Sequence, residues 1–195
     1  KVGVDPEFLF PIEELQSPSC RLLKMTSDAF FAGSARDYGA FDLIFLDGLH
    51  VATQTLRDFC GSLACSHAGT LWLIDDTVPP DWIASLASRN AFRVLRRVLR
   101  RPGTWTGDVF RSAVALHDLF PQFTLATFTG RGQTVVWREN RTDFRPAKAS
   151  LAAVLRMSFF EFARGYRRWL NVQDPEPLFE RLSTRQGLNT YSTPN

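Results

Sequence analysis

Two short apolar runs, each ending in acidic residues, constrain the fold of this chain more than any other feature. The runs are Phe41–Leu46, followed by Asp47, and Thr70–Ile74, followed by Asp75 and Asp76. Continuous apolar runs joined by a helix-length connector are typical of parallel strands that are buried on both faces of a sheet. The crossover between such strands is almost always right-handed, so both runs should end at one rim of the sheet. Ligands of open α/β sheets bind at that rim.

The residues at this rim are suited to holding a hard cation. Asp47, Asp75 and Asp76 offer carboxylate oxygens, and strands about 5 Å apart would let them converge on one ion. His50, three residues after Asp47, titrates near neutral pH and could accept a proton there. Taken alone, His50 would be interpreted as a loop histidine bonded to a backbone carbonyl, but its place after Asp47 and opposite Asp75-Asp76 favours a functional group. Because consecutive strand residues point to opposite faces, both Asp75 and Asp76 reach the ion only if the strand has already ended.

Composition sets the class of protein. At 195 residues, with 45% hydrophobic residues, the chain can bury the core of one domain with an appendage. Its net charge of +3 is unevenly placed, because six arginines and no acid lie between Arg89 and Arg101. A solvated basic face explains this run, and an anionic partner is the alternative. Three cysteines without a CxxC motif indicate reduced thiols of a cytoplasmic protein. We expect no membrane span, because no apolar run approaches about 20 residues.

Further strand and helix patterns complete a fold prediction for residues 1–140. Strand patterns occupy Lys1–Val4, Arg21–Met25, Phe123–Phe128 and Thr134–Trp137. Helical patterns occupy Phe30–Arg36, Thr53–Cys65, Trp82–Ala87, Asn90–Arg101 and Val109–Leu119. We therefore predict an α/β domain with a Rossmann-like, mostly parallel sheet, helices on both faces, and an antiparallel hairpin closing one edge.

Two strand ends outside the acidic rim carry candidate binding residues. Asp5 ends the first strand, where it could accept hydrogen bonds from a ribose diol or simply begin a turn before Pro6. Ser27, Asp28 and Ala29 follow the second strand. Either Ser27 or Asp28 is expected to cap the next helix, which does not exclude a ligand contact.

The last part of the chain, residues 141–195, is predicted to be a helical extension. Apolar residues recur every three or four positions from Leu151 to Trp169. This spacing predicts an amphipathic helix that is docked either on the domain or on another subunit. In the second case the protein would be a homo-oligomer. A membrane-surface helix is a further reading. A short helix should begin at Asp174-Pro175, and Ser183–Asn195 is expected to be poorly ordered.

The order of these motifs resembles that of class I S-adenosylmethionine-dependent methyltransferases, entered at their second strand. The resemblance covers roughly Lys1–Glu139. The D-G-x-H motif at Asp47–His50 and the pair Asp75-Asp76 are similar, more specifically, to metal-dependent sugar O-methyltransferases of macrolide pathways. The family's first strand and glycine-rich loop are missing from this sequence, and would form a βα unit of about 30 residues before Lys1.

The resemblance implies a role for each candidate residue. Asp5 would hold the cofactor ribose, and Ser27, Asp28 and Ala29 would line the adenine. Asp47 would lie beside the cofactor and also bind Mg²⁺ together with Asp75 and Asp76, and His50 would act as the base. The segment Trp105–Asp108 lies where such enzymes place a loop over the substrate.

The expected function is therefore S-adenosylmethionine-dependent O-methylation of a small-molecule or sugar hydroxyl, assisted by Mg²⁺. No nucleic-acid partner is expected. An NAD-type oxidoreductase remains an alternative, because Asp5 would serve NAD equally well. A non-catalytic, methyltransferase-like binding protein that acts through its basic tail is another.

Overall fold

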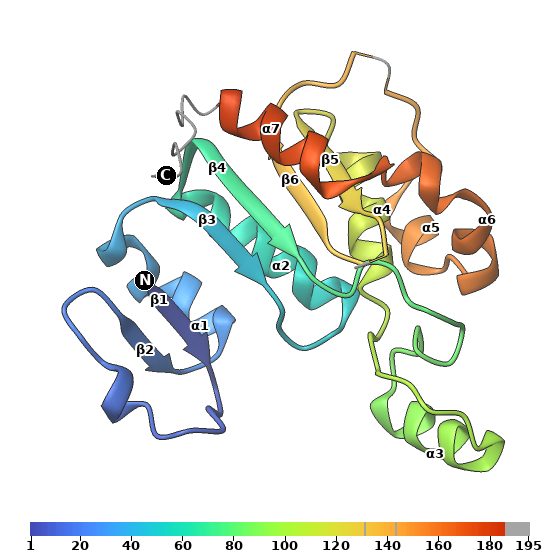
Figure 1. Cartoon of the computed structure of the whole chain (residues 1–195), viewed down its shortest axis with the longest axis horizontal. Helices are drawn as coiled ribbons and strands as arrows, with labels where there is room; N and C mark the ends of the chain where they lie inside the picture. The colour runs from blue at the N-terminus through green and yellow to red at the C-terminus, as the bar shows by residue number, and fades with distance from the viewer. Residues whose placement is uncertain (131, 143, 186–195) are drawn as a thin grey trace, which may run out of the picture.

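The computed structural model describes residues 1–130, 132–142 and 144–185, and its centre is a five-stranded sheet (Figure 1). The strand order is β3 (Phe41–Leu46), β4 (Ser66–Ile74), β6 (Thr134–Arg138), β5 (Phe123–Phe128) and β7 (Val172–Gln173). β6 runs antiparallel to both of its neighbours, whereas β3 pairs with β4, and β5 with β7, in parallel. All strands of this sheet except β6 therefore share one direction, which confirms the predicted Rossmann-like, mostly parallel α/β fold.

The two strands that end in acids are neighbours, as predicted. Leu43 is in register with Leu71, and Leu46 with Ile74, so β3 and β4 end level with each other. The hairpin of β5 and β6 is also antiparallel as expected. It is not the outermost element, however, because the two-residue strand β7 pairs with the far side of β5.

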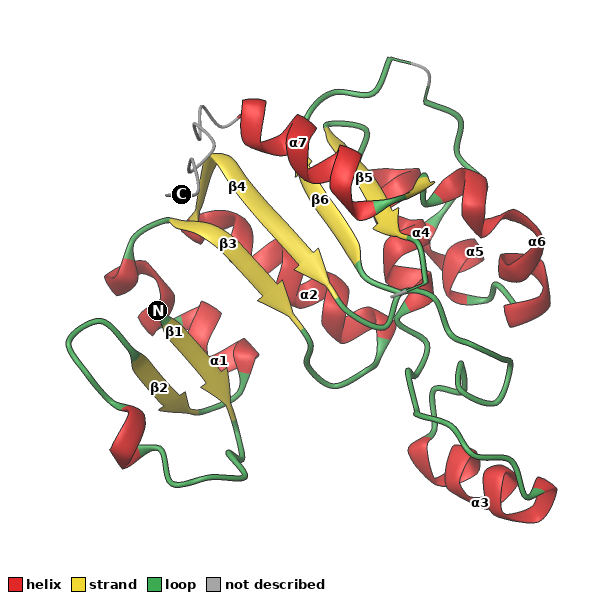
Figure 2. Ribbon diagram, viewed as in Figure 1, coloured by secondary structure: helices red, strands yellow, loops and turns green. Residues whose placement is uncertain are grey.

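A second, two-stranded sheet lies beside β3. It consists of β1 (Val2–Asp5) and β2 (Arg21–Lys24), paired in parallel. Val2 and Val4 pack against a small cluster around Phe30, and Phe41 at the start of β3 packs against the same cluster. The arrows of β1 and β3 point the same way in Figure 2, but the two strands do not pair within the described residues.

Consequently β3 is an edge strand, and the expectation that it is buried on both faces is wrong. Leu43 is 59% exposed and Phe45 is 51% exposed. Both side chains project from the same face, because alternate residues of a strand share a face. An uncovered face and an unpaired edge explain why an apolar run meets solvent here.

Helices cover both faces of the main sheet. One face is covered by α2 (Ala52–Ser62) and α4 (Phe110–Leu119), with α5 (Leu151–Leu155) and α6 (Phe159–Trp169) packed beyond α4. On the opposite face lies α7 (Pro175–Arg185), which buries Leu178 and Leu182 against β5 and β6. The remaining helices are α1 (Ser27–Ala32), α3 (Arg89–Leu99) and three short 3₁₀ turns, at Glu13–Leu15, Ser34–Tyr38 and Leu63–Cys65.

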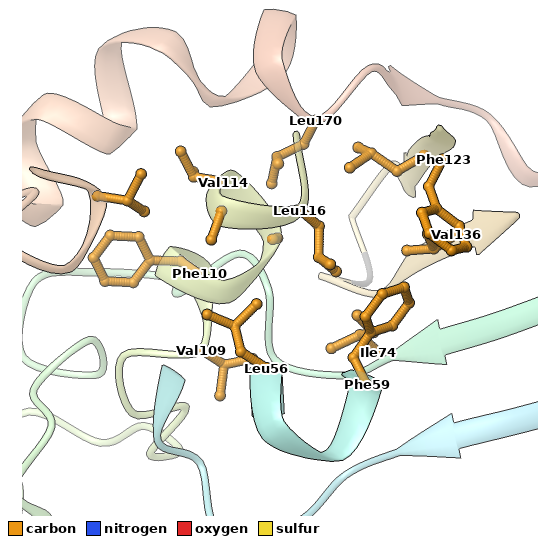
Figure 3. Close-up of a cluster of buried hydrophobic side chains, with 14 of the residues drawn as sticks. Leu56, Phe59, Ile74, Val109, Phe110, Val114, Leu116, Phe123, Val136 and Leu170 are labelled. Atoms are coloured by element: carbon orange, nitrogen blue, oxygen red, sulfur yellow. The ribbon is translucent and has the colours of Figure 1, made fainter. Parts of the chain in front are cut away.

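The core between α2, α4 and the sheet holds the acidic rim in place (Figure 3). Phe59 of α2 is fully buried, and its ring lies 5.3 Å from Trp72 of β4 and 5.2 Å from Phe123 of β5. Trp72 also donates a hydrogen bond from Nε1 to Ser62 Oγ at 2.8 Å. Burying a side chain such as Phe59 contributes about 2–3 kcal/mol. This packing ties α2, and the loop before it, to β4.

Several helix boundaries differ from those predicted. Thr26, rather than Ser27 or Asp28, caps α1, because its Oγ1 accepts the Ala29 N–H at 3.2 Å. No helix forms over Trp82–Ala87, where the chain makes turns instead.

The helices after residue 150 also differ from the prediction. The single helix predicted from Leu151 to Trp169 is broken into α5 and α6, because Ser158 starts a new helix by accepting the Glu161 N–H at 3.2 Å. α6 is docked on its own domain, with Phe162 against Phe110 at 4.7 Å between ring centres. The helix α7 includes Ser183, and the rest of the segment expected to be poorly ordered, from residue 186 on, lies outside the described residues.

Across the described residues, no helix combines the length and the apolar content needed to cross a membrane.

Candidate active site

The candidate site lies where β3 and β4 end. Asp47 directly follows β3, and Asp75 and Asp76 follow β4, which ends at Ile74. The Asp75 N–H donates to the Leu46 carbonyl at 3.1 Å, which joins the two strand ends. Asp76 adopts a left-handed conformation with φ of 57°. The two acids have therefore left the strand, and its alternation no longer forces them to opposite faces.

Three side chains converge at this rim. The ligand atoms of Asp47, His50 and Asp76 all lie within 4.8 Å of one another. His50 Nδ1 lies 2.6 Å from Asp76 Oδ2, and His50 Nε2 lies 3.9 Å from Asp47 Oδ1. The contact between Nδ1 and Asp76 lacks the alignment of a hydrogen bond and is an ion pair when the imidazole is protonated. The three residues line a cavity of ≈ 10 Å³, which is close to the space that one water or ion occupies.

Asp75 lies at the same cavity but outside this group of three. Its Oδ1 accepts the Asp76 N–H at 2.9 Å, and its Oδ2 lies 3.5 Å from Gln133 Nε2. One carboxylate oxygen of Asp75 thus supports the turn that aims Asp76. The structure brings together Asp47, His50 and Asp76, whereas the sequence pattern had suggested Asp47, Asp75 and Asp76.

The segment Trp105–Asp108 fixes the position of His50. The ring of Trp105 stacks on that of His50, with centres 5.2 Å apart and planes 21° apart. A Cβ atom on Gly107, whose φ is +62°, would lie 1.8 Å from the His50 carbonyl oxygen. Only glycine fits this close approach. The structure places this segment against the histidine, and its expected position over a substrate stays a prediction.

Asp108 anchors the beginning of α2 behind the site. Its Oδ1 accepts the Ala52 N–H at 2.8 Å, and its Oδ2 lies 2.7 Å from Arg111 Nη1. Arg111 in turn donates to the Met157 carbonyl at 3.0 Å. Asp108 is buried and acts as the missing N-cap of α2, because Val51 provides no side-chain cap. Sequence reasoning missed this role, since the two partners are 56 positions apart.

The electrostatics of the site favour a bound cation. Burial raises the pKa of Asp47, and the negative charges of Asp75 and Asp76 raise it further. The contact with Asp76 raises the pKa of His50, and this effect outweighs burial, which lowers it. Asp75 and Asp76 thus both repel the ionised form of Asp47. A cation between Asp47 and Asp76 would relieve this repulsion.

The residues expected to bind the cofactor lie at the ends of β1 and β2. Asp5 is exposed, and its Oδ1 accepts the Glu7 N–H at 2.7 Å, which is the geometry of a turn. Ser27, Asp28 and Ala29 form the first turn of α1. The backbone N–H of Ala29 is used by the Thr26 cap.

Asp28 contacts two residues of α2, the helix that follows the loop of Asp47 and His50. Its carboxylate lies 2.9 Å from Arg57 Nη1 and accepts Gln54 Nε2 at 3.0 Å. The hydrogen bond from Gln54, with help from Arg57, lowers the pKa of Asp28. Gln54 also reaches Ser27 Oγ at 3.3 Å. Gln54 and Arg57 were not among the residues predicted, because nothing in their local pattern distinguishes them from a solvated helix face.

No protein-family profile matches the sequence, and no curated protein matches it. Among solved structures, the chain is similar to the MycE methyltransferase from the mycinamycin biosynthetic pathway in complex with Mg and SAH. That similarity has a TM-score of 0.46 and 18% identity, and covers 76% of this chain and 38% of MycE. The chain is also similar to a Staphylococcus aureus protein assigned as a caffeoyl-CoA O-methyltransferase, with a TM-score of 0.40, 12% identity, and coverage of 64% of this chain and 53% of that one. The chain thus spans well under two thirds of the length of either protein.

Proposed function

We propose that this chain is part of an S-adenosylmethionine-dependent methyltransferase that methylates a hydroxyl group of a small molecule or sugar with the help of a divalent metal. The observation that carries the proposal is the convergence of Asp47, His50 and Asp76 at the carboxyl ends of two adjacent parallel strands. The order of motifs along the sequence supports the choice of cofactor.

The donor set fits a divalent cation. Asp47 and Asp76 would hold the metal, and Asp75 would orient Asp76 through its backbone N–H. A bound divalent cation supplies Lewis acidity, which lowers the pKa of a coordinated hydroxyl. Carboxylates alone suit Mg²⁺, whereas an imidazole among the ligands would shift the preference towards transition metals.

His50 would act as the general base. Methyl transfer from a sulfonium is a direct displacement, so the enzyme must aim a deprotonated oxygen at the methyl carbon. His50 Nδ1 faces Asp76, so the neutral imidazole carries its proton on that nitrogen. Nε2 is then left as the proton acceptor. Trp105 holds the ring in this orientation by stacking on it, and Gly107 lies against the His50 backbone.

Cofactor binding would involve Asp5, which would accept the ribose hydroxyls, and Ser27, Asp28 and Ala29, which would line the adenine. We further propose that the glycine-rich βα unit missing from residues 1–140 lies between β1 and β3. The two strands run in the same direction without pairing (Figure 1). The exposed Leu43 and Phe45 would be covered by the helix of that unit. Residues 141–195 would form the helical extension of the domain.

Calorimetry on the full-length protein tests the choice of cofactor. We expect S-adenosylhomocysteine to bind and NAD not to bind. Binding of NAD alone would indicate the oxidoreductase, and binding of neither would indicate a protein without this cofactor site.

A chelation experiment tests the role of the metal. Methyl transfer to an acceptor hydroxyl should stop in EDTA and return with added Mg²⁺. If EDTA had no effect, the three acids would be structural caps and substrate hydrogen-bond acceptors, with His50 acting alone as base.

A further inference from the structure

The helix α3 stands apart from the rest of the molecule. Figure 1 shows it projecting beyond the body, at the end opposite β1 and β2. The stretch from Arg89 to Arg101 contains six arginines and no acid. With 100° between successive residues, the apolar side chains fall on one half of the helix and the arginines on the other.

Two arginines attach α3 to neighbouring segments: Arg96 is the buried residue of the helix, and Arg89 lies over the Trp105 ring at 5.8 Å. Arg96 is almost fully buried, and its Nη2 lies 2.9 Å from Asp81 Oδ2. A Cβ atom on Gly103 would lie 2.6 Å from that same nitrogen, so the returning chain closes tightly over Arg96. Phe92 packs against the Arg96 guanidinium at 5.3 Å. Because Arg96 is the buried residue of α3, the side of the helix opposite Arg96 is the exposed one.

That opposite side of α3 lies across the boundary between the arginine half and the apolar half, so it is both basic and apolar. Val94 is 60% exposed and Val98, one turn later, is 70% exposed. Arg93, Arg97 and Arg101 are exposed beside them. Within residues 1–130, 132–142 and 144–185, none of these three arginines forms an ion pair. Asp81, the acid nearest to α3 along the chain, is used by Arg96.

We propose that this face of α3 binds an anionic lipid surface. Val94 and Val98 would enter the boundary between headgroups and acyl chains, and Arg93, Arg97 and Arg101 would contact the lipid phosphates. Exposed apolar residues beside a row of cationic ones are the composition of helices that lie in the plane of a membrane interface. Each cationic residue near such a surface adds to binding, and the attraction falls off within a Debye length.

Other occupants fit this face less well. A second copy of α3 would place arginines against arginines without an acid to pair with them. Nucleic acid would engage the arginines through its phosphates, but would leave Val94 and Val98 without an apolar contact. A projecting, convex helix is suited to lying on an extended flat surface.

The test is co-sedimentation of the purified protein with vesicles. Vesicles of phosphatidylcholine containing about 30% phosphatidylglycerol are compared with pure phosphatidylcholine in about 0.1 M salt, where electrostatic attraction acts over about 10 Å. We expect binding to the anionic vesicles only. The double substitution Arg93→Glu with Arg97→Glu should lower the partition coefficient at least about tenfold.

Two further variants distinguish insertion of the two valines from a general effect of net charge. Val94→Asp with Val98→Asp should also lower the partition coefficient at least about tenfold, because it removes the inserted apolar surface. The matched control is Arg156→Glu with Arg164→Glu, which makes the same change in net charge at exposed positions near α5 and α6. Its partition coefficient should stay within about twofold of the original protein, because these positions lie outside α3. Circular dichroism confirms that each variant is folded.

Several outcomes would overturn the proposal. These are a failure to bind anionic vesicles, an equal loss of binding in the control variant, and full binding by the valine variant. Binding to a DNA duplex that depends on α3 in place of vesicles would identify a nucleic-acid surface. A dimer in light scattering that the valine substitutions dissociate would identify an interface between copies. None of these measurements depends on methyl transfer.

Discussion

His50 Nδ1 and Asp76 Oδ2 lie 2.6 Å apart, although the two residues belong to the loops after two different strands. Both residues have φ of 57°, in the left-handed region that non-glycine residues rarely adopt. Residues in such conformations persist where the surrounding structure holds them, and they gather at functional sites. Here the holding contacts are the Trp105 stack on His50 and the Asp75 hydrogen bond to the Asp76 N–H.

The first prediction concerns the proton on His50. Asp76→Asn removes the charge that raises the His50 pKa, so that pKa should fall towards or below the ordinary value. An NMR titration of the imidazole in metal-free buffer with EDTA measures it. His67, which pairs with Asp42 at 3.0 Å, provides the internal control signal. An unchanged His50 pKa would mean that the two side chains are not coupled in solution.

The same contact predicts a pH dependence of stability. A histidine whose pKa is raised by folding contributes stability that is fully present below its unfolded pKa and is lost as pH rises through its folded pKa. The stability difference between the original protein and Asp76→Asn should therefore be larger in mildly acidic than in alkaline buffer. Urea unfolding in EDTA at several pH values measures it, and a difference independent of pH would contradict the assignment.

The second prediction ranks the three acids as metal ligands. Asp47→Asn and Asp76→Asn should each weaken Mn²⁺ binding by at least about tenfold, because each removes a charged oxygen from the converging group. Asp75→Asn should have a smaller effect, because Asp75 acts through the Asp76 backbone. Electron paramagnetic resonance of free Mn²⁺ gives the affinities. Equal losses for all three variants would favour the trio suggested by the sequence pattern.

The third prediction concerns Gly107. Gly107→Ala should destabilise the protein by about 3 kcal/mol or more, because the new Cβ would collide with the His50 carbonyl oxygen at a left-handed position. Gly39→Ala is the matched control, since Gly39 has φ of +73° with nothing within 4 Å of the added Cβ. It should cost less than Gly107→Ala, about 1–3 kcal/mol, from its backbone conformation alone, which has ψ of −152° and is nearly restricted to glycine. Chemical unfolding compares the two variants.

The fourth prediction concerns Asp108. Asp108→Ala should destabilise the protein by about 3–5 kcal/mol, because it leaves the Arg111 guanidinium without its carboxylate and the first N–H of α2 without a cap. Asp42→Ala, which removes an exposed ion pair with His67, should cost less than about 1 kcal/mol. Similar melting temperatures for the two variants would show that the Asp108 network contributes little.

The fifth prediction concerns Asp5. If its carboxylate accepts the ribose hydroxyls, Asp5→Ala should weaken S-adenosylhomocysteine binding by about 1–3 kcal/mol in the full-length protein. Calorimetry measures the change. Since Asp5 also accepts the Glu7 N–H, the same variant should be checked for an altered turn by its unfolding midpoint. Unchanged affinity would mean that Asp5 does not bind the ribose and only stabilises the turn through the Glu7 N–H.

The sequence by itself determined the strands β1 to β6 and the acidic rim. The apolar runs of β3 and β4 and their helix-length connector predicted parallel neighbours, because short continuous apolar runs joined in this way are typical of parallel strands. The acids after each run were predicted to meet, and Asp47 and Asp76 do meet. The amphipathic spacing in α2, α4 and α6 likewise predicted helices that pack on the sheet.

Only the tertiary structure decided how the site is built. His50 is paired with Asp76, stacked on Trp105 and crowded by Gly107, and these partners are distant in sequence and joined only by the fold. Asp75 turns to the backbone because β4 ends before it, a choice between two adjacent acids that no periodicity encodes. The exposure of Leu43 and Phe45 was likewise decided by the tertiary structure. An apolar run shows that a strand can be buried, but whether it is buried depends on which neighbours cover it.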